Sequence, residues 1–142
     1  MSELILPDVV ATVPDDGLPI GEAAAACGLT VDALRYYERE GLMLAPAPRN
    51  AAGQRRYGGR DIRWLAGLAM LRGTGMGIDG IRRYAELARE QGTETERMAL
   101  LEEHRRQVLA HMAETRRHLA AIDRKISAYR DKAAEDSAAV IP

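Results

Sequence analysis

The chain has 142 residues, enough for one small domain and an extension but not for two full domains. Its hydrophobic share of 46% and charged share of 29% are typical of a soluble folded chain, and no apolar run approaches the roughly 18 residues of a membrane span. The single Cys27 excludes an intrachain disulfide and a cysteine-cluster metal site. We therefore expect a cytoplasmic protein with no membrane partner, no metal and no cofactor.

The net charge of −1 conceals an uneven distribution along the chain. Residues 1–17 contain acidic side chains and no basic one, which together with their turn-prone prolines predicts an acidic tail. Residues 49–63 contain five arginines against Asp61 alone, whereas from residue 93 onward nine basic and nine acidic side chains cancel. The positive charge is therefore local, as phosphate binding requires.

Two short helices are predicted first. Residues 20–27 form an Ala-rich stretch that ends at a glycine, the usual residue just past a helix end. Thr30 is a good N-cap for a second helix over residues 31–40, with Asp32 in its first turn to suit the helix dipole. Two short helices joined by a tight turn predict a helix-turn-helix.

A hairpin and two further helices follow. Residues 42–44 and 54–57 are short extended segments on either side of a loop with Pro and Gly, which weakly indicates a hairpin. Asp61 is expected to open a third helix, and apolar residues at helical spacing from Ile78 mark a fourth that ends near Gly92.

The last segment has the clearest pattern. Spacings of three and four alternate over four heptads, interrupted only by Arg105 and Thr115, which predicts a coiled coil. A helix from residue 98 to residue 129 would be about 48 Å long and could not bury this seam against a small head, so a second copy is needed. The heptads alone do not distinguish parallel from antiparallel pairing. The expected dimerisation residues are Met98, Leu101, Val108, Met112, Leu119, Ile122, Ile126 and Tyr129.

An ordered set of short motifs supports a family resemblance. The set consists of IGEAA (20–24), GLTV (28–31), LRYYE (34–38), Gly41-Leu42, Pro46, Arg49, GQRRY (53–57), Asp61, Leu65, GMGI (75–78), Ile81, Leu100-Leu101, His104, Val108, Ile122, Lys125-Ile126 and Tyr129. Over about residues 19–130 this set closely resembles the MerR family of transcriptional regulators, in its small form without an effector domain. The resemblance implies a mostly α fold: a winged helix-turn-helix DNA-binding domain (18–92), a coiled-coil dimerisation helix (93–134) and a C-terminal tail (135–142).

DNA contacts are expected from the second helix and the wing. The helix at 31–40 would enter the major groove, where Arg35 suits a guanine edge or a phosphate. Tyr36 and Tyr37 are adjacent and point about 100° apart, so one can face DNA while the other packs inside. As implied by the resemblance, Arg49 and Arg55 match DNA-contacting wing positions, whereas the family usually has Tyr where this chain has Gln54. The expected DNA-binding residues are Thr30, Asp32, Arg35, Tyr36, Tyr37, Arg49, Gly53, Gln54, Arg55, Arg56 and Tyr57.

The resemblance also implies a mechanism. A homodimer with antiparallel long helices would bind a promoter dyad with an overlong spacer and distort it, so that RNA polymerase reaches both promoter elements. No catalytic constellation occurs at workable spacing, so an enzyme is not expected. The alternatives are an architectural or phage-type winged-helix DNA binder without effector control, and a coiled-coil adaptor that has lost DNA binding.

The sequence does not identify an effector. Cys27 lies at the end of the first helix and is interpreted as a buried small hydrophobe rather than a thiol switch. His104, His111 and His118 recur every seven residues on one flank of the seam, where they form a solvated edge or, less simply, a pH- or metal-responsive flank.

Overall fold

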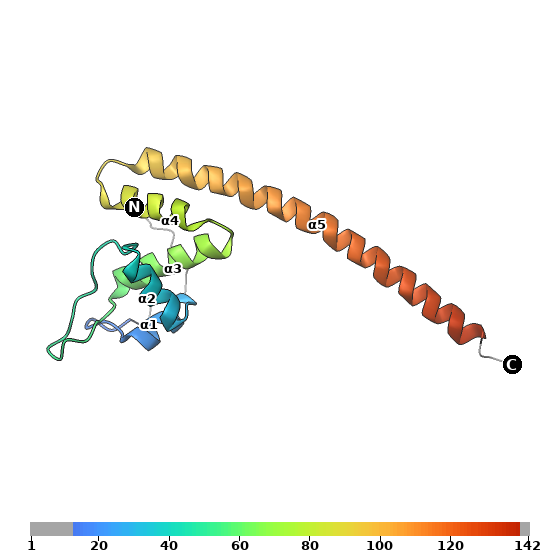
Figure 1. The fold of residues 1–142 in the computed structure, drawn as a ribbon, viewed down its shortest axis with the longest axis horizontal. Coiled ribbons are helices and arrows are strands. Elements are labelled where there is room, and N and C mark those ends of the chain that lie inside the picture. Colours follow the sequence, from blue (N-terminus) through green and yellow to red (C-terminus); the bar gives the residue numbers. More distant parts are fainter. Residues whose placement is uncertain (1–12, 140–142) are drawn as a thin grey trace. The chain divides into compact units, whose positions relative to one another are not determined.

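A computed structural model describes residues 13–139 of the chain, shown as a ribbon in Figure 1. The chain divides into two compact units, one up to Leu101 and one from Glu102 onward. Five helices follow one another in the described part, and within it no strand forms; only two isolated antiparallel bridges are present. The expected mostly α architecture is confirmed.

Helices α1 (Ile20–Cys27) and α2 (Val31–Arg39) form the helix-turn-helix. Gly28 has a φ of 72° after α1, a left-handed conformation that glycine adopts without steric cost. The Thr30 hydroxyl accepts a 3.1 Å hydrogen bond from the Ala33 N–H, which caps α2 as expected. Helix α2 ends one residue earlier than predicted, because Glu40 is its C-cap.

Helices α3 (Gly59–Gly73) and α4 (Ile78–Arg89) follow in the first unit, the part of the chain up to Leu101, which we call the head. Helix α3 begins two residues before the predicted start at Asp61. The Asp61 carboxylate accepts a 3.0 Å hydrogen bond from the Gly58 N–H, so Asp61 caps the first turn from inside the helix.

The core of the first unit is formed by all four helices and by the loop that follows α2. Trp64 on α3 donates from Nε1 to the Leu42 carbonyl at 2.7 Å and stacks on Tyr84 of α4, with ring centroids 5.6 Å apart. Leu101, which the sequence analysis assigns to the dimer seam, packs with Leu100 against this core. The fully buried large side chains are Leu34, Leu42, Tyr57, Ile62, Leu65, Leu68 and Ile81.

The loop between α2 and α3 extends from the helices as a wing (Figure 1). The predicted hairpin is only partly correct. Residues 43–45 form a bend, and Leu42 and Met43 are buried. The returning segment pairs instead with Arg49, which is bridged to Arg55. Leu42 and Met43 are apolar and are buried in the core. Of the predicted hairpin, only the Arg49–Arg55 bridge near the tip of the loop therefore forms.

The second bridge ties the wing to the segment just before α1. The backbone of Leu18 exchanges hydrogen bonds of 2.8 and 2.9 Å with that of Tyr57, and Val13 packs against the core. Residues 13–17 therefore belong to the folded head rather than to a tail. Glu3 and Asp8 of the expected acidic tail lie outside the described residues.

Helix α5 (Glu94–Ala139) contains 46 residues and continues past the expected end at residue 134, so residues 135–139 are helical rather than part of a tail. Residues 140–142 lie outside the described part. No helix within residues 13–139 combines the length and the hydropathy needed to cross a bilayer. Beyond the first turns, the helix exposes large apolar side chains: Leu109, Met112, Leu119, Ile122, Ile126 and Tyr129.

Candidate nucleic-acid interface

A hollow of about 580 Å³ opens between α2, the start of α1 and the wing. Five arginines and one carboxylate line it, so its charge is strongly positive although the chain as a whole is nearly neutral. A concave basic surface of this kind is suited to a polyanion. The lining residues are Pro19, Ile20, Arg35, Glu38, Arg39, Arg49, Gln54, Arg55 and Arg56.

Helix α2 contributes two exposed arginine side chains to the hollow. Arg35 and Arg39 are four residues apart and so share one helix face. Both are exposed, and neither makes a hydrogen bond or ion pair with any other residue of the described part. Arg35 was expected in this place, whereas Arg39 was not; its i+4 spacing from Arg35 could have revealed it.

The adjacent tyrosines of α2 divide between surface and core. The Tyr36 side chain is 39% exposed and Tyr37 only 4% exposed, as expected for neighbouring helical positions. Burial raises the pKa of the Tyr37 hydroxyl above its usual value. Tyr37 therefore packs inside the head, and only Tyr36 can reach a ligand. Thr30 and Asp32, at the start of the same helix, are exposed.

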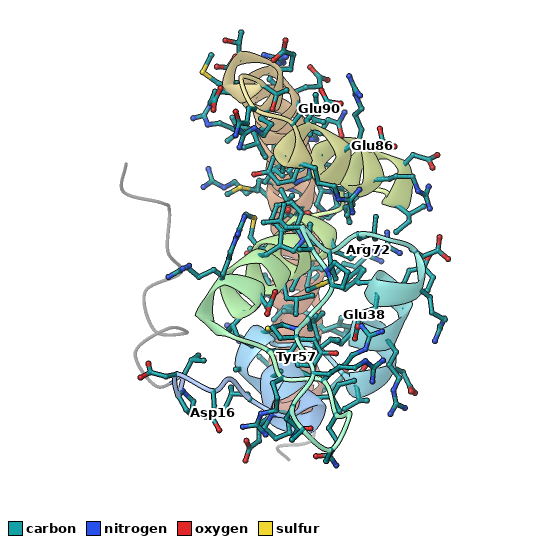
Figure 2. The ribbon with its side chains drawn as sticks, turned by 90° about the vertical axis from the view of Figure 1, so that its left-hand side faces the viewer. Asp16, Glu38, Tyr57, Arg72, Glu86 and Glu90 are labelled. Carbon is teal, nitrogen blue, oxygen red and sulfur yellow. The ribbon has the colours of Figure 1, made fainter. Side chains whose placement is uncertain are left out.

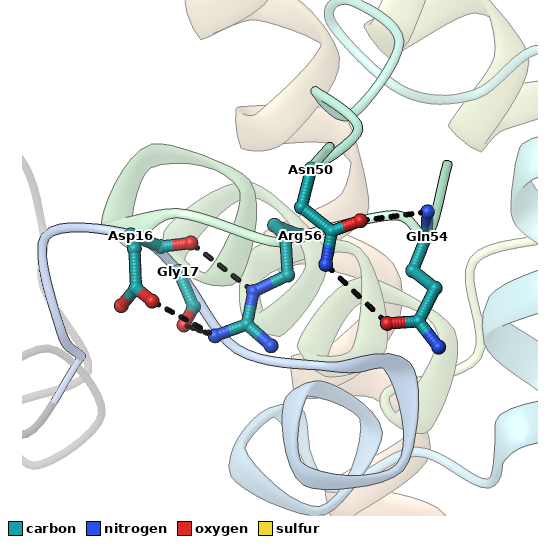
Figure 3. A network of polar contacts seen from close by, with 5 residues as sticks. All are labelled: Asp16, Gly17, Asn50, Gln54 and Arg56. Carbon is teal, nitrogen blue, oxygen red and sulfur yellow. Dashed lines mark hydrogen bonds and ion pairs between the residues drawn. The ribbon is translucent and has the colours of Figure 1, made fainter. Parts of the chain in front are cut away.

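Asn50 organises the tip of the wing (Figure 3). Its side-chain oxygen accepts hydrogen bonds of 3.0 Å from the N–H groups of Ala52 and Gln54, and its amide nitrogen donates to Gln54 Oε1 at 3.3 Å. Gly53 has a φ of 78°, and its carbonyl accepts a 2.6 Å hydrogen bond from Arg49. Asn50 was not among the expected site residues, although an Asn that opens a turn ending in Gly is a known turn signal.

Arg56 is directed toward Asp16 and Gly17, in the segment before α1 (Figure 3). Its guanidinium donates to the carbonyls of Gly17 at 2.7 Å and Asp16 at 3.2 Å, and it lies 3.4 Å from the Asp16 carboxylate. A Cβ at Gly17 would lie 2.9 Å from the Tyr57 carbonyl oxygen, so the two segments approach as closely as only glycine permits. Arg56 thus fixes the wing to the N-terminal segment.

Glu38 connects α2 to the wing. The Tyr57 hydroxyl donates to one carboxylate oxygen of Glu38, and Arg55 forms an ion pair with the other. Glu38 and Tyr57 lie near one another in Figure 2. Tyr57 was expected to contact DNA, but its side chain is fully buried, and burial raises the pKa of its hydroxyl. Both rings fill the core, and their burial argues against the direct DNA contact expected for Tyr57 and Tyr37.

Cys27 is a buried side chain of the head core. The Cys27 side chain is buried, its thiol donates to the Ile62 carbonyl at 3.6 Å, and burial raises its pKa to about 11. A thiol with that pKa is not poised as a switch at neutral pH. Among residues 13–139, no group of three or more His, Cys, Asp and Glu side chains is arranged to hold a metal ion.

Comparison with known proteins places this arrangement in a family. The model of the MerR HTH family of regulatory proteins matches residues 18–88, from the Leu18 bridge to the last turn of α4. The chain belongs to the MerR family. An uncharacterised HTH-type transcriptional regulator of Haemophilus influenzae is 35% identical over 109 residues, which cover 76% of this chain and 80% of that protein.

Solved structures of MerR proteins have the same fold. The crystal structure of HiNmlR, described as a MerR family regulator lacking the sensor domain and bound to promoter DNA, superposes with a TM-score of 0.78 at 31% identity. The alignment covers 88% of this chain and 96% of HiNmlR. A MerR family regulator from Listeria monocytogenes has a TM-score of 0.72 at 33% identity over 80% of this chain and 86% of that one. The likeness thus extends into α5.

Proposed function

We propose that this MerR family member is a sequence-specific transcriptional regulator that binds promoter dyad sites as a homodimer. The observation that supports it best is the arginine-lined hollow between α2 and the wing, on a fold shared with a regulator crystallised on promoter DNA. A promoter regulator works in the cytoplasm, and no catalysis is part of this role.

In the proposed complex, α2 lies in the major groove. Arg35 and Arg39 face the DNA from the exposed side of the helix, with Tyr36 beside them, and Thr30 and Asp32 lie at the helix end that enters the groove first. Tyr37 contributes by holding α2 in the core.

The wing is proposed to contact the phosphate backbone. Arg49, Gln54 and Arg55 line the hollow, with Gly53 at the turn that presents them. Phosphate contacts of this kind set the register of the protein on the duplex. Arg56 and Tyr57 keep the wing in place rather than touch the DNA, since both are engaged within the head.

Dimerisation is proposed to occur through α5. A lone helix cannot bury an apolar stripe, and a second copy of α5 would cover it. The seam consists of Met98, Val108, Met112, Leu119, Ile122, Ile126 and Tyr129, while Leu101 is already packed on its own head. Two heads joined in this way would match a DNA site with dyad symmetry.

Regulation is proposed to act through the shape of the promoter. The dimer would bend and untwist an overlong spacer, so that RNA polymerase, its proposed partner at the promoter, engages both elements. The energy of deformation then depends on the spacer sequence, including base pairs that the protein does not touch.

Selection of bound fragments from the source genome with purified protein, followed by footprinting, tests this function. We expect protection of an inverted repeat centred between two promoter elements. Protection without dyad or promoter bias would instead favour an architectural DNA binder. If folded, dimeric protein enriched nothing at moderate salt, DNA binding would be rejected and the adaptor alternative would stand.

A further inference from the structure

Glu38 is the acidic residue among the nine that line the hollow, and it lies on the helix proposed to read the DNA. Its side chain is only 10% exposed, whereas the Arg55 side chain with which it pairs is 38% exposed. A carboxylate in such a place reduces the attraction for phosphate that the surrounding arginines create. Attraction for phosphate therefore does not explain why a carboxylate lies at this position.

Two contacts compensate the charge of Glu38. The Tyr57 hydroxyl donates to one oxygen and the Arg55 guanidinium binds the other, so both come from the wing side of the hollow. Neighbouring Arg35 and Arg39, in contrast, make no hydrogen bond or ion pair with any described residue. Glu38 therefore offsets part of the charge that Arg55 offers to a phosphate, while it joins the wing to α2.

We propose that Glu38 is a specificity-determining residue, which lowers sequence-independent affinity for DNA and holds the wing at a fixed position relative to α2. This inference rests on the proposed function. Sequence-independent affinity comes from neutralised phosphates, so a carboxylate in the hollow reduces it on every duplex. Sequence-dependent affinity requires that α2 contacts the base edges while the wing contacts the phosphate backbone. The contacts of Glu38 hold α2 and the wing in a fixed relation and so support both contacts at once.

The magnitude follows from counterion release. Each additional phosphate that the protein neutralises makes the slope of log K against log salt steeper by about 0.9. Relative to about 1 M salt, that slope corresponds to about a five-fold gain in affinity at physiological salt. Glu38→Gln removes the charge but retains an oxygen that can accept from Tyr57. We expect this variant to bind a mixed-sequence duplex about five-fold more tightly, with a steeper salt slope, and to gain less on the duplex carrying the selected repeat.

The experiment is a fluorescence anisotropy titration of both duplexes over a range of salt, for the full-length protein and its variants. Glu86→Gln is the matched control, since Glu86 pairs with Arg83 at 3.6 Å on α4, apart from Glu38 and Tyr57 in Figure 2. It makes the same change in net charge outside the hollow. The selectivity ratio of the two duplexes is expected to fall in Glu38→Gln and to stay constant in Glu86→Gln.

Several outcomes would overturn the proposal. If Glu38→Gln left the mixed-sequence affinity and slope unchanged, or if both variants raised them alike, Glu38 would have no special role. The proposed function would still stand in that case, provided that the wild-type protein binds the selected duplex more tightly than the mixed-sequence duplex. Wild-type protein that binds neither duplex, although folded and dimeric, would reject both.

Tyr57→Phe provides a second arm if Glu38→Gln does not fold. It removes only the hydroxyl that ties Glu38 to the wing, from a ring that stays buried. We expect its affinity for the selected duplex to fall by more than its affinity for the mixed-sequence duplex. An unchanged selectivity ratio in a stably folded Tyr57→Phe would contradict the tie.

Discussion

The head and helix α5 use the same kinds of apolar side chain in opposite ways. In the head, Leu34, Leu65 and Ile81 are fully buried within one chain. In α5, Leu119, Ile122 and Ile126 are about half exposed, and Tyr129 is 74% exposed. Four helices enclose a core in the head, whereas in the described part of α5 the apolar side chains of the seam stay exposed.

The two units therefore obtain their stability in different ways. The head can gain its hydrophobic free energy alone, so changes in its core should act on folding of the monomer. The stripe of α5 gains free energy only when another surface covers it, so changes there should act on association. Predictions that separate folding from association therefore test the comparison directly.

The largest effect is expected from Ile122→Asp, in the middle of the seam. Both copies of a dimer would carry the change, so the free energy of association should fall by about 4–10 kcal/mol, twice the usual loss for one buried aliphatic side chain. Sedimentation should show monomers, and affinity for the selected duplex should fall by more than about 100-fold, because two linked heads no longer bind together.

Ala120→Asp is the control for that experiment. Ala120 is exposed on α5 but lies outside the seam, so the same charge placed there should leave the dimer intact. A dimeric Ile122→Asp would show that the stripe is not the interface. Dissociation of both variants would show that charge on α5, rather than its stripe, controls assembly.

Leu65→Ala should produce the converse result, a loss of folding stability with association retained. Removal of a fully buried leucine costs about 2–5 kcal/mol of unfolding free energy, depending on how far the cavity collapses. Urea unfolding followed by fluorescence of Trp64, which stacks on Tyr84 within this core, measures it. Met70→Ala, at an exposed position of α3, should change stability by less than about 0.5 kcal/mol.

The folded Leu65→Ala protein should still be a dimer in sedimentation. If the dimer dissociated at concentrations where the head remains folded, the two units would not be energetically separate. In that event the head core and the seam of α5 would differ in exposure, but folding and association would not have separate sources of free energy.

The sequence predicted the helices well and the wing poorly, for physical reasons. Helix signals are local: the glycine at position 28 and the Thr30 cap locate the ends of α1 and α2 to within one residue. The wing depends on contacts between distant segments, such as Leu18 with Tyr57, which no periodicity reveals.

The candidate site shows the same division. Arg35 and Arg49 could be placed at the surface from charge and pattern, and both line the hollow. Burial of Tyr57 could not be predicted, because an aromatic residue beside arginines is equally suited to a core or to a nucleic acid. Its hydrogen bond to Glu38, nineteen residues earlier, decides the matter and is visible only in three dimensions.

The smallest effect concerns Cys27, and it tests whether the head core is closed to water at α1. Burial raises the thiol pKa from 9.0 to about 11, so the folded state favours the protonated form. The resulting stability is fully present below pH 9 and is lost as the pH rises toward 11, by on the order of 2 kcal/mol. Cys27→Ala should lack this component, so the difference in unfolding free energy between wild type and variant should shrink over that interval. Tyr37 and Tyr57 titrate in both proteins and cancel from the difference. Parallel pH profiles would show that the thiol is solvated in the native state, and the contrast between a dry head and an open α5 would then fail at this helix.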